Sequence, residues 1–201
     1  MSAISASTVQ DLRSRTGAGM MDCKKALTET NGDIEKAVDY LRKKGISSAE
    51  KKAGRETKQG SIISYIHGGG RIGVLLEINC ETDFVARNES FQGFARDLAM
   101  HVAASNPPFL NREAVPADLL KKEKDIHRDQ MKDQKKPENI IEKIIEGKIN
   151  RFYEENCLLE QAFVKNPDIT VGDYLKETIG KIGENIVVSR YVRFELGQAA
   201  A

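Results

Sequence analysis

The chain has 201 residues, 40% hydrophobic and 30% charged, which is enough for one well-packed core and a small additional domain. Lys and Arg total 31 against 30 Asp and Glu, so the net charge of +1 gives no overall attraction to nucleic acid or to an anionic membrane. The three cysteines are far apart, no apolar run approaches the ~20 residues of a membrane span, and the N-terminus lacks a signal-peptide core. We therefore expect a soluble cytoplasmic protein that recognises any partner by local surface chemistry.

Three short helices are predicted at the N-terminus. Ser7 and Gln10 have the spacing of a capping box for the first helix, and Asp33 is the expected N-cap of the third. Apolar residues of the third helix repeat at helical spacing until Gly45, which is expected to end it. These features predict a compact three-helix domain over residues 1–45.

A linker and a β-hairpin are predicted next. Residues 46–60 are polar, rich in Lys and punctuated by Gly, with little apolar periodicity. Strands are predicted at 61–67 and 71–80, on either side of three consecutive glycines that suit a tight turn. The β-branched and aromatic residues of 186–194 predict a late strand that joins this hairpin in one sheet.

The remaining sequence is mostly helical in character. An apolar stripe begins after Ser90, and residues 117–136 are helix-prone but so polar that we expect an exposed arm. A stronger apolar pattern restarts at Pro137 and continues through Phe163, and a last helix is expected from Thr170. The predicted class is α+β, with a core domain at 61–201 that packs helices and a helical arm against a mainly antiparallel three-stranded sheet.

The usual signatures of enzymes are missing from the sequence. His67 and the glycines after it resemble the oxyanion loop of an esterase, but no GxSxG nucleophile motif accompanies them, so a hairpin turn is favoured. There is no HExxH and no phosphate-binding glycine loop, so we expect no metal, nucleotide or cofactor site. Glu81 and Asp83 are interpreted as solvated surface, and the Lys-rich stretch 121–136 is nearly balanced by acidic residues, which disfavours a nucleic-acid arm. A binding protein is the better interpretation.

The strongest candidate site is the segment Thr82, Asp83, Phe84 and Val85, between a predicted buried strand and a predicted core helix. Phe84 is either part of the core, as a Phe beside an amphipathic helix usually is, or an exposed anchor for a partner. Composition does not decide between these two alternatives.

A second candidate lies on the second predicted helix. Met20 and Met21 point about 100° apart on a helix, so both can hardly face one small core. An exposed methionine beside Lys24 suits a contact with another protein, and a solvated basic face is the alternative.

Three segments carry a family resemblance: TGAGMMDCKKAL at 16–27, TDFVARN at 82–88 and GKIGENIVVSR at 180–190. In this order they resemble the bacterial-type elongation factor Ts family, in a short form, and the region 110–167 is similar only in helical character. The resemblance implies an N-terminal domain like ubiquitin-associated domains, a linker and a core that bind the GTPase elongation factor Tu and exchange GDP for GTP.

The resemblance also implies roles for the two candidate sites. The loop with Asp83 and Phe84, flanked by Thr82 and Val85, would push between helices of the GTPase and dislocate Mg²⁺ and the GDP phosphates. The helix with Met20, Met21 and Lys24 would contact its nucleotide domain. Two rival hypotheses are an adaptor that binds ubiquitin-like modifiers and an esterase that uses His67. Whether two copies pair through the strand at 186–194 is left open.

Overall fold

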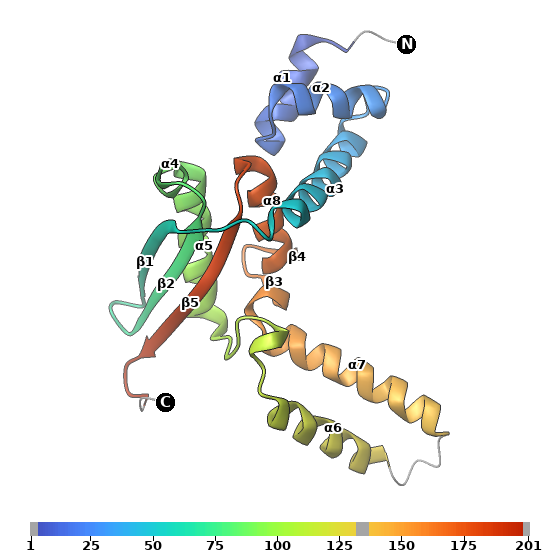
Figure 1. Ribbon diagram of the computed structural model, residues 1–201, viewed down its shortest axis with the longest axis vertical. Coiled ribbons are helices and arrows are strands. Elements are labelled where there is room, and N and C mark those ends of the chain that lie inside the picture. Colours follow the sequence, from blue (N-terminus) through green and yellow to red (C-terminus); the bar gives the residue numbers. More distant parts are fainter. Residues whose placement is uncertain (1–3, 132–136, 199–201) are drawn as a thin grey trace. The chain divides into compact units, whose positions relative to one another are not determined.

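The structure, a computed structural model, describes residues 4–131 and 137–198. Its helices are α1 (Ala6–Thr16), α2 (Met20–Glu29), α3 (Ile34–Lys52), α4 (Asp83–Ala86), α5 (Glu89–Ser105), α6 (Ala117–Met131), α7 (Glu138–Asn156) and α8 (Val171–Ile182). Its strands are β1 (Gln59–His67), β2 (Ile72–Cys80), β3 (Ala162–Phe163), β4 (Asn166–Thr170) and β5 (Ile186–Glu195) (Figure 1). The α+β class is confirmed; the last five residues of the predicted helical stretch 117–136 lie outside the described residues.

The main sheet has the strand order β1-β2-β5, so the last strand of the chain lies beside the second (Figure 1). Alternate residues of β2, namely Val74, Leu76 and Ile78, are buried because successive side chains of a strand point to opposite faces. Glycines 68–70 all have positive φ, a conformation that residues with a Cβ rarely adopt, and they form the turn of the hairpin. The predicted three-stranded antiparallel sheet is confirmed.

The chain forms two compact units, and the first comprises the residues up to Ser64, 75–97 and 173–191. Within it, α1, α2 and α3 surround a small core made of Val9, Leu12, Cys23, Ala26, Leu27 and Ala37. Asp33 caps α3 as predicted, because its carboxylate accepts the Lys36 N–H at 3.0 Å. Gly17 ends α1 in the left-handed conformation.

The second unit comprises residues 65–74, 98–172 and the chain from Val192 onward. Here α6 and α7 lie side by side as two antiparallel helices (Figure 1). Fully buried His101 accepts the Val164 N–H through Nδ1 at 3.3 Å, so its proton sits on Nε2, which donates to Gln161 Oε1 at 2.9 Å. Burial lowers the pKa of His101, against an opposing effect of the Gln161 hydrogen bond. This histidine is a neutral structural residue.

Two predictions about the N-terminal helices are wrong. The cap of α1 is Ser5 instead of Ser7, since Ser5 Oγ accepts the Thr8 N–H at 3.1 Å. Helix α3 passes through Gly45 and ends at Lys52, so residues 46–52 of the predicted linker are helical. One glycine costs a helix only about 1 kcal/mol, which the helix-forming residues that follow and the burial of Ala49 offset. The division into domains itself stays a prediction.

A third wrong prediction concerns the segment after α7, which was expected to remain helical through Phe163. Helix α7 ends at Asn156, and a short 3-10 turn leads into the hairpin of β3 and β4. The backbone N–H of Leu158 donates to Phe109 O at 2.8 Å, so this segment pairs with a distant part of the chain. Leu158 and Phe163 are buried all the same, and burial alone does not distinguish a helix from other apolar segments.

Candidate partner-binding site

Helix α4 is a single turn that follows β2 directly, and it carries the four residues predicted as the main site. Thr82 is its N-cap, with Oγ accepting the Val85 N–H at 3.4 Å. The Glu184 carboxylate, from the turn between α8 and β5, accepts the Thr82 N–H at 3.0 Å and the Thr82 hydroxyl at 2.8 Å. The Cys80 thiol donates to Thr82 O at 3.1 Å. The start of the turn is therefore fixed from several sides.

Phe84 projects from this turn into solvent with 81% of its surface exposed. The alternative that Phe84 belongs to the core is wrong, because Ala86 is the buried residue of the turn and Thr82 and Val85 are half-buried. Asp83 beside it pairs with Arg87 four residues on, at 2.9 Å, and its side chain remains 47% exposed. An aromatic ring and a carboxylate thus stand together on one turn that is anchored at its base. We call Asp83 and Phe84 the tip.

The second predicted patch lies on α2. Met20 is 43% and Met21 76% exposed, so both methionines face solvent, where at least one was expected to. Lys24 lies one helical turn beyond Met20 and is also exposed, whereas Cys23, Ala26 and Leu27 take the buried face of the helix. A pliant apolar surface beside a cation is a favourable contact for another protein.

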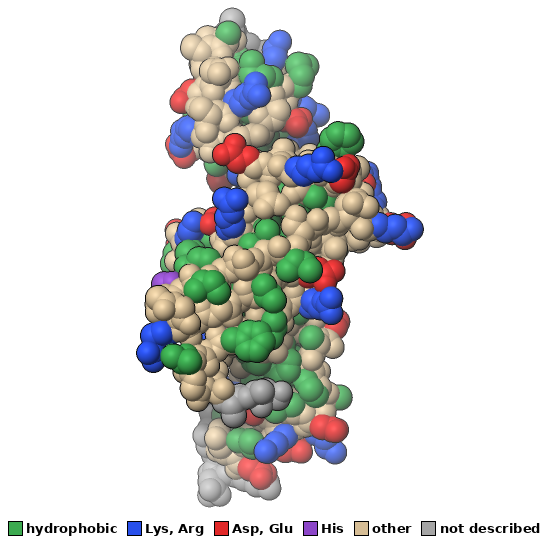
Figure 2. Space-filling model, turned by 90° about the vertical axis from the view of Figure 1, so that its left-hand side faces the viewer, with side chains coloured by type: hydrophobic (Ala, Val, Ile, Leu, Met, Phe, Trp, Pro, Cys, Tyr) green, Lys and Arg blue, Asp and Glu red, His purple; other side chains and the backbone are tan. Residues whose placement is uncertain are grey.

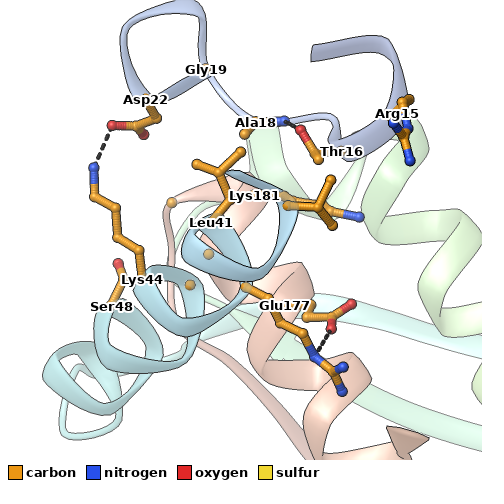
Figure 3. Close-up of a pocket in the computed structure, with 15 residues that line it drawn as sticks. Arg15, Thr16, Ala18, Gly19, Asp22, Leu41, Lys44, Ser48, Glu177 and Lys181 are labelled. Carbon is orange, nitrogen blue, oxygen red and sulfur yellow. Dashed lines mark hydrogen bonds and ion pairs between the residues drawn. The ribbon is translucent and has the colours of Figure 1, made fainter. Parts of the chain in front are cut away.

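A cleft of about 450 Å³ opens between the α1–α2 turn, α3 and α8, all in the first unit (Figure 3). Two ion pairs lie along its walls: Lys44 donates to Asp22 at 2.5 Å, and Arg42 lies 3.0 Å from Glu177. At its floor α3 and α8 approach closely, since a Cβ on Gly180 would lie 2.7 Å from Gly45 Cα. These contacts make the cleft a seam between helices in which several of the charged side chains are paired with one another.

The other residues considered for chemistry have structural partners. Nδ1 of exposed His67 forms a hydrogen bond of 3.1 Å with the Tyr65 hydroxyl, and Glu81 accepts the Asn185 N–H at 2.6 Å. All three cysteines are buried thiols, and burial raises the pKa of Cys157 to about 11. Over residues 4–131 and 137–198, no group of three or more His, Cys, Asp or Glu could hold a metal ion. The helices in those ranges are also too short or too polar to cross a bilayer.

An exposed aromatic on an anchored turn, together with a second exposed apolar patch on α2, is typical of the class of proteins that act by binding another protein. A profile described as "Elongation factor TS" matches residues 20–198. The chain is 63% identical over 195 residues to elongation factor Ts of Geobacter sulfurreducens, which covers 97% of this chain and 90% of the relative. The chain belongs to the elongation factor Ts family, the guanine-nucleotide exchange factors of elongation factor Tu.

Two further relatives have similar lengths. Elongation factor Ts of Desulfosudis oleivorans is 58% identical over 198 residues, 98% of this chain and 100% of the relative. That of Fervidobacterium nodosum is 60% identical over 195 residues, 97% of this chain and 99% of the relative. The expected resemblance to a short form of the family is confirmed, and the protein is a translation elongation factor and not an enzyme.

Sequence reasoning missed two features near the site. The Thr82–Glu184 hydrogen bonds join residues 102 positions apart, and the sequence around either residue contains no signal that predicts the other as its partner. The close approach of Gly45 to Gly180 was also missed, although a signal existed. A glycine inside a helix is unfavourable unless the space at that position is needed, so two mid-helix glycines favour a helix–helix contact.

Proposed function

We propose that this chain releases GDP from elongation factor Tu by inserting the tip, Asp83 and Phe84, between helices of the GTPase, with Thr82 and Val85 as its base. The observation that supports this most strongly is the 81% exposure of Phe84 on an anchored turn. Burying a Phe side chain contributes about 1.5–3 kcal/mol, so a partner that covers Phe84 gains free energy that this chain leaves unused. We infer a cytoplasmic location, because translation elongation in bacteria takes place there.

Insertion of the tip would act on the metal and phosphates of the bound nucleotide. Mg²⁺ neutralises much of the charge of the GDP phosphates, so a displaced metal ligand weakens the hold on GDP. No bond to the nucleotide needs to form or break. The coupling is reciprocal: the factor by which this chain weakens GDP binding equals the factor by which GDP weakens binding of this chain. The nucleotide-free GTPase is therefore the preferred partner.

The exposed face of α2 supplies the second contact. Met20, Met21 and Lys24, in the N-terminal domain of residues 1–45, dock on the nucleotide-binding domain of the GTPase. Two separated contacts raise affinity beyond either alone, because the second forms within an existing complex. The contact needs no nucleic acid and no cofactor.

The test is the release of fluorescent GDP from purified elongation factor Tu. Phe84→Ala should fold normally and release GDP roughly thirtyfold more slowly. This corresponds to a loss of about 2 kcal/mol or more of binding free energy in the exchange complex, as expected for a hot-spot residue. Ile126→Ala removes an exposed aliphatic side chain from α6 and serves as the matched control, with no loss expected. Wild-type release rates with Phe84→Ala would show that the tip is not the active element.

A second copy of this chain is a further partner. Ile66, Val192, Phe194 and Leu196, all in the second unit, are exposed large apolar residues, and Figure 2 shows hydrophobic side chains gathered on the side of the hairpin. Single domains rarely leave such groups in water together. A two-fold axis pairs a patch with itself, so a self-complementary apolar surface fits a homodimer.

Sedimentation equilibrium tests the homodimer. The wild type should sediment as a dimer at micromolar concentrations, and Phe194→Glu should shift it to the monomer because a charge would be buried at the interface. A wild type that remains monomeric at these concentrations would exclude this proposal.

A further inference from the structure

The tip needs support from elsewhere in the chain. Helix α4 has four residues, and a single helical turn is not stable by itself because nucleation orders several residues for one hydrogen bond. Its charged pair, Asp83 with Arg87, is largely solvent-exposed and adds little. The orientation of Phe84 must therefore be fixed by contacts at the base of the turn.

Thr82 provides that base, and each of its polar groups has a partner. The N–H donates to Glu184 Oε2 at 3.0 Å and the hydroxyl to Glu184 Oε1 at 2.8 Å, so one carboxylate receives both. The hydroxyl in turn accepts the Val85 N–H, and the carbonyl oxygen accepts the Cys80 thiol. Hydrogen bonds to an ionised carboxylate are about twice as strong as neutral ones. Glu184 is thus the strongest link between the turn and the rest of the unit.

Glu184 is itself held in place by its neighbours. Gly183, at φ 90°, ends α8 and turns the chain so that the next residues point toward the β2–α4 junction. Asn185 is 2% exposed; its N–H donates to Glu81 at 2.6 Å and its side-chain amide donates to Arg55 O at 2.9 Å. The consecutive residues Glu184 and Asn185 therefore form hydrogen bonds with both Thr82 and Glu81.

Among the hydrogen bonds of the described residues, the Glu184 carboxylate takes part only in those to Thr82. Glu184 forms no ion pair among the described residues, and its position at the base of the turn leaves the exposed ring of Phe84 free. Its charge also contributes to the raised pKa of the Cys80 thiol, after burial as the main cause, which keeps the thiol protonated as the donor to Thr82 O. Glu184 acts on the tip only through Thr82.

From this geometry we propose that Glu184 is a positioning residue for nucleotide exchange, which orients Asp83 and Phe84 by fastening the N-cap Thr82. The inference rests on the proposed function of the tip. A tip that is already held in place enters the partner without first being ordered. Removal of the Glu184 carboxylate should therefore leave docking of α2 intact but slow the step at which the tip displaces its target.

The experiment compares Glu184→Ala, Glu184→Gln and the control Glu77→Gln in release of fluorescent GDP from purified elongation factor Tu. Glu77 is a matched carboxylate on β2 whose partner is Arg190 at 2.7 Å, away from the tip. Glu184→Ala should lower the maximal release rate at saturating factor roughly tenfold, since hydrogen bonds to a charged group are lost. Glu184→Gln should restore most of the rate, because its amide can accept from the Thr82 N–H and donate to the hydroxyl. Glu77→Gln should match the wild type.

Hydrogen exchange of the peptide covering residues 82–86 gives a second readout in the protein alone. Exchange should be faster in Glu184→Ala than in the wild type and near normal in Glu184→Gln. Should Glu184→Ala not fold, Thr82→Val keeps the shape of the side chain without its hydroxyl and should lower the maximal rate in the same way.

The inference is overturned if folded Glu184→Ala releases GDP at the wild-type maximal rate, or if only the half-saturating concentration changes. It is also overturned if exchange at 82–86 is the same with and without the carboxylate. An inactive wild type would instead reject the proposed function of the tip, and the hydrogen-exchange comparison would still decide whether Glu184 fastens Thr82.

Discussion

Replacing Gly180 by alanine tests the contact between α3 and α8 directly. The added Cβ would lie 2.7 Å from Gly45 Cα and 3.3 Å from Gly45 O, where ordinary contacts are 3.4–4 Å. Both opposing atoms belong to the backbone, so no side-chain rotation can relieve the overlap. The two helices would have to move apart, and the cleft between them would widen (Figure 3).

The expected magnitude follows from two opposing effects. Alanine is favoured over glycine inside a helix by about 1 kcal/mol, and overpacking a tight contact costs about 1–3 kcal/mol. We expect Gly180→Ala to lower the free energy of unfolding by about 1 kcal/mol. Gly147 in α7 has no neighbouring atom within 4 Å of its would-be Cβ, so Gly147→Ala should raise it by about 1 kcal/mol.

Urea unfolding followed by circular dichroism measures both variants against the wild type. The difference between the two glycines is the informative quantity, because the helix-propensity gain is common to both and only the packing differs. If Gly180→Ala is stabilised as much as Gly147→Ala, the two helices do not touch at this point and the reasoning is refuted.

Three further predictions concern other residues. Burial lowers the pKa of His101, so the unfolded chain binds a proton near pH 6.5 that the folded chain refuses; stability from this residue is complete above about pH 6.5 and falls as the pH drops below it. Urea unfolding at pH 7.5 and 5.5 should show this loss, and His101→Gln should show a flatter dependence. Met21→Asp should weaken binding to elongation factor Tu about tenfold without changing thermal stability, since the side chain is exposed, and equal affinity in a binding titration would contradict the α2 contact. The buried thiols, with the pKa of Cys157 at about 11, should resist a thiol reagent at pH 8 in the folded chain and react in urea; rapid labelling of the folded chain would disprove their burial.

Elements specified by short-range chemistry were predictable from the sequence. The hairpin follows from the glycines at 68–70, and α5 follows from an apolar stripe that starts at Phe91 and is buried along its length. The strand β5 could be assigned to the same sheet because its composition matches and the earlier hairpin leaves an edge to be paired. Each of these signals lies within the element it describes.

The errors occurred where distant parts of the chain decide the local structure. Glycine is typical of helix ends, but α3 continues through Gly45. The missing side chain at this position allows the close contact with Gly180 instead. The residues after Asn156 have the apolar content of a helix, but their backbone pairs with residues 109 and 110. Whether Phe84 is buried or exposed could not be predicted from the sequence for the same reason. It depends on the orientation of the turn, which the distant Glu184 holds at Thr82.

The fastening of Thr82 by a residue 102 positions later has a consequence for biosynthesis. A ribosome extrudes the chain from its N-terminus, so the tip segment emerges well before Glu184 and the strand β5 that follows it. Until then the β1–β2 hairpin has only part of its sheet, and the N-cap Thr82 lacks the carboxylate that accepts its N–H and hydroxyl. A prematurely terminated chain that stops short of the α8–β5 turn would carry the tip sequence without its support, so truncated products should be poor competitors for the GTPase.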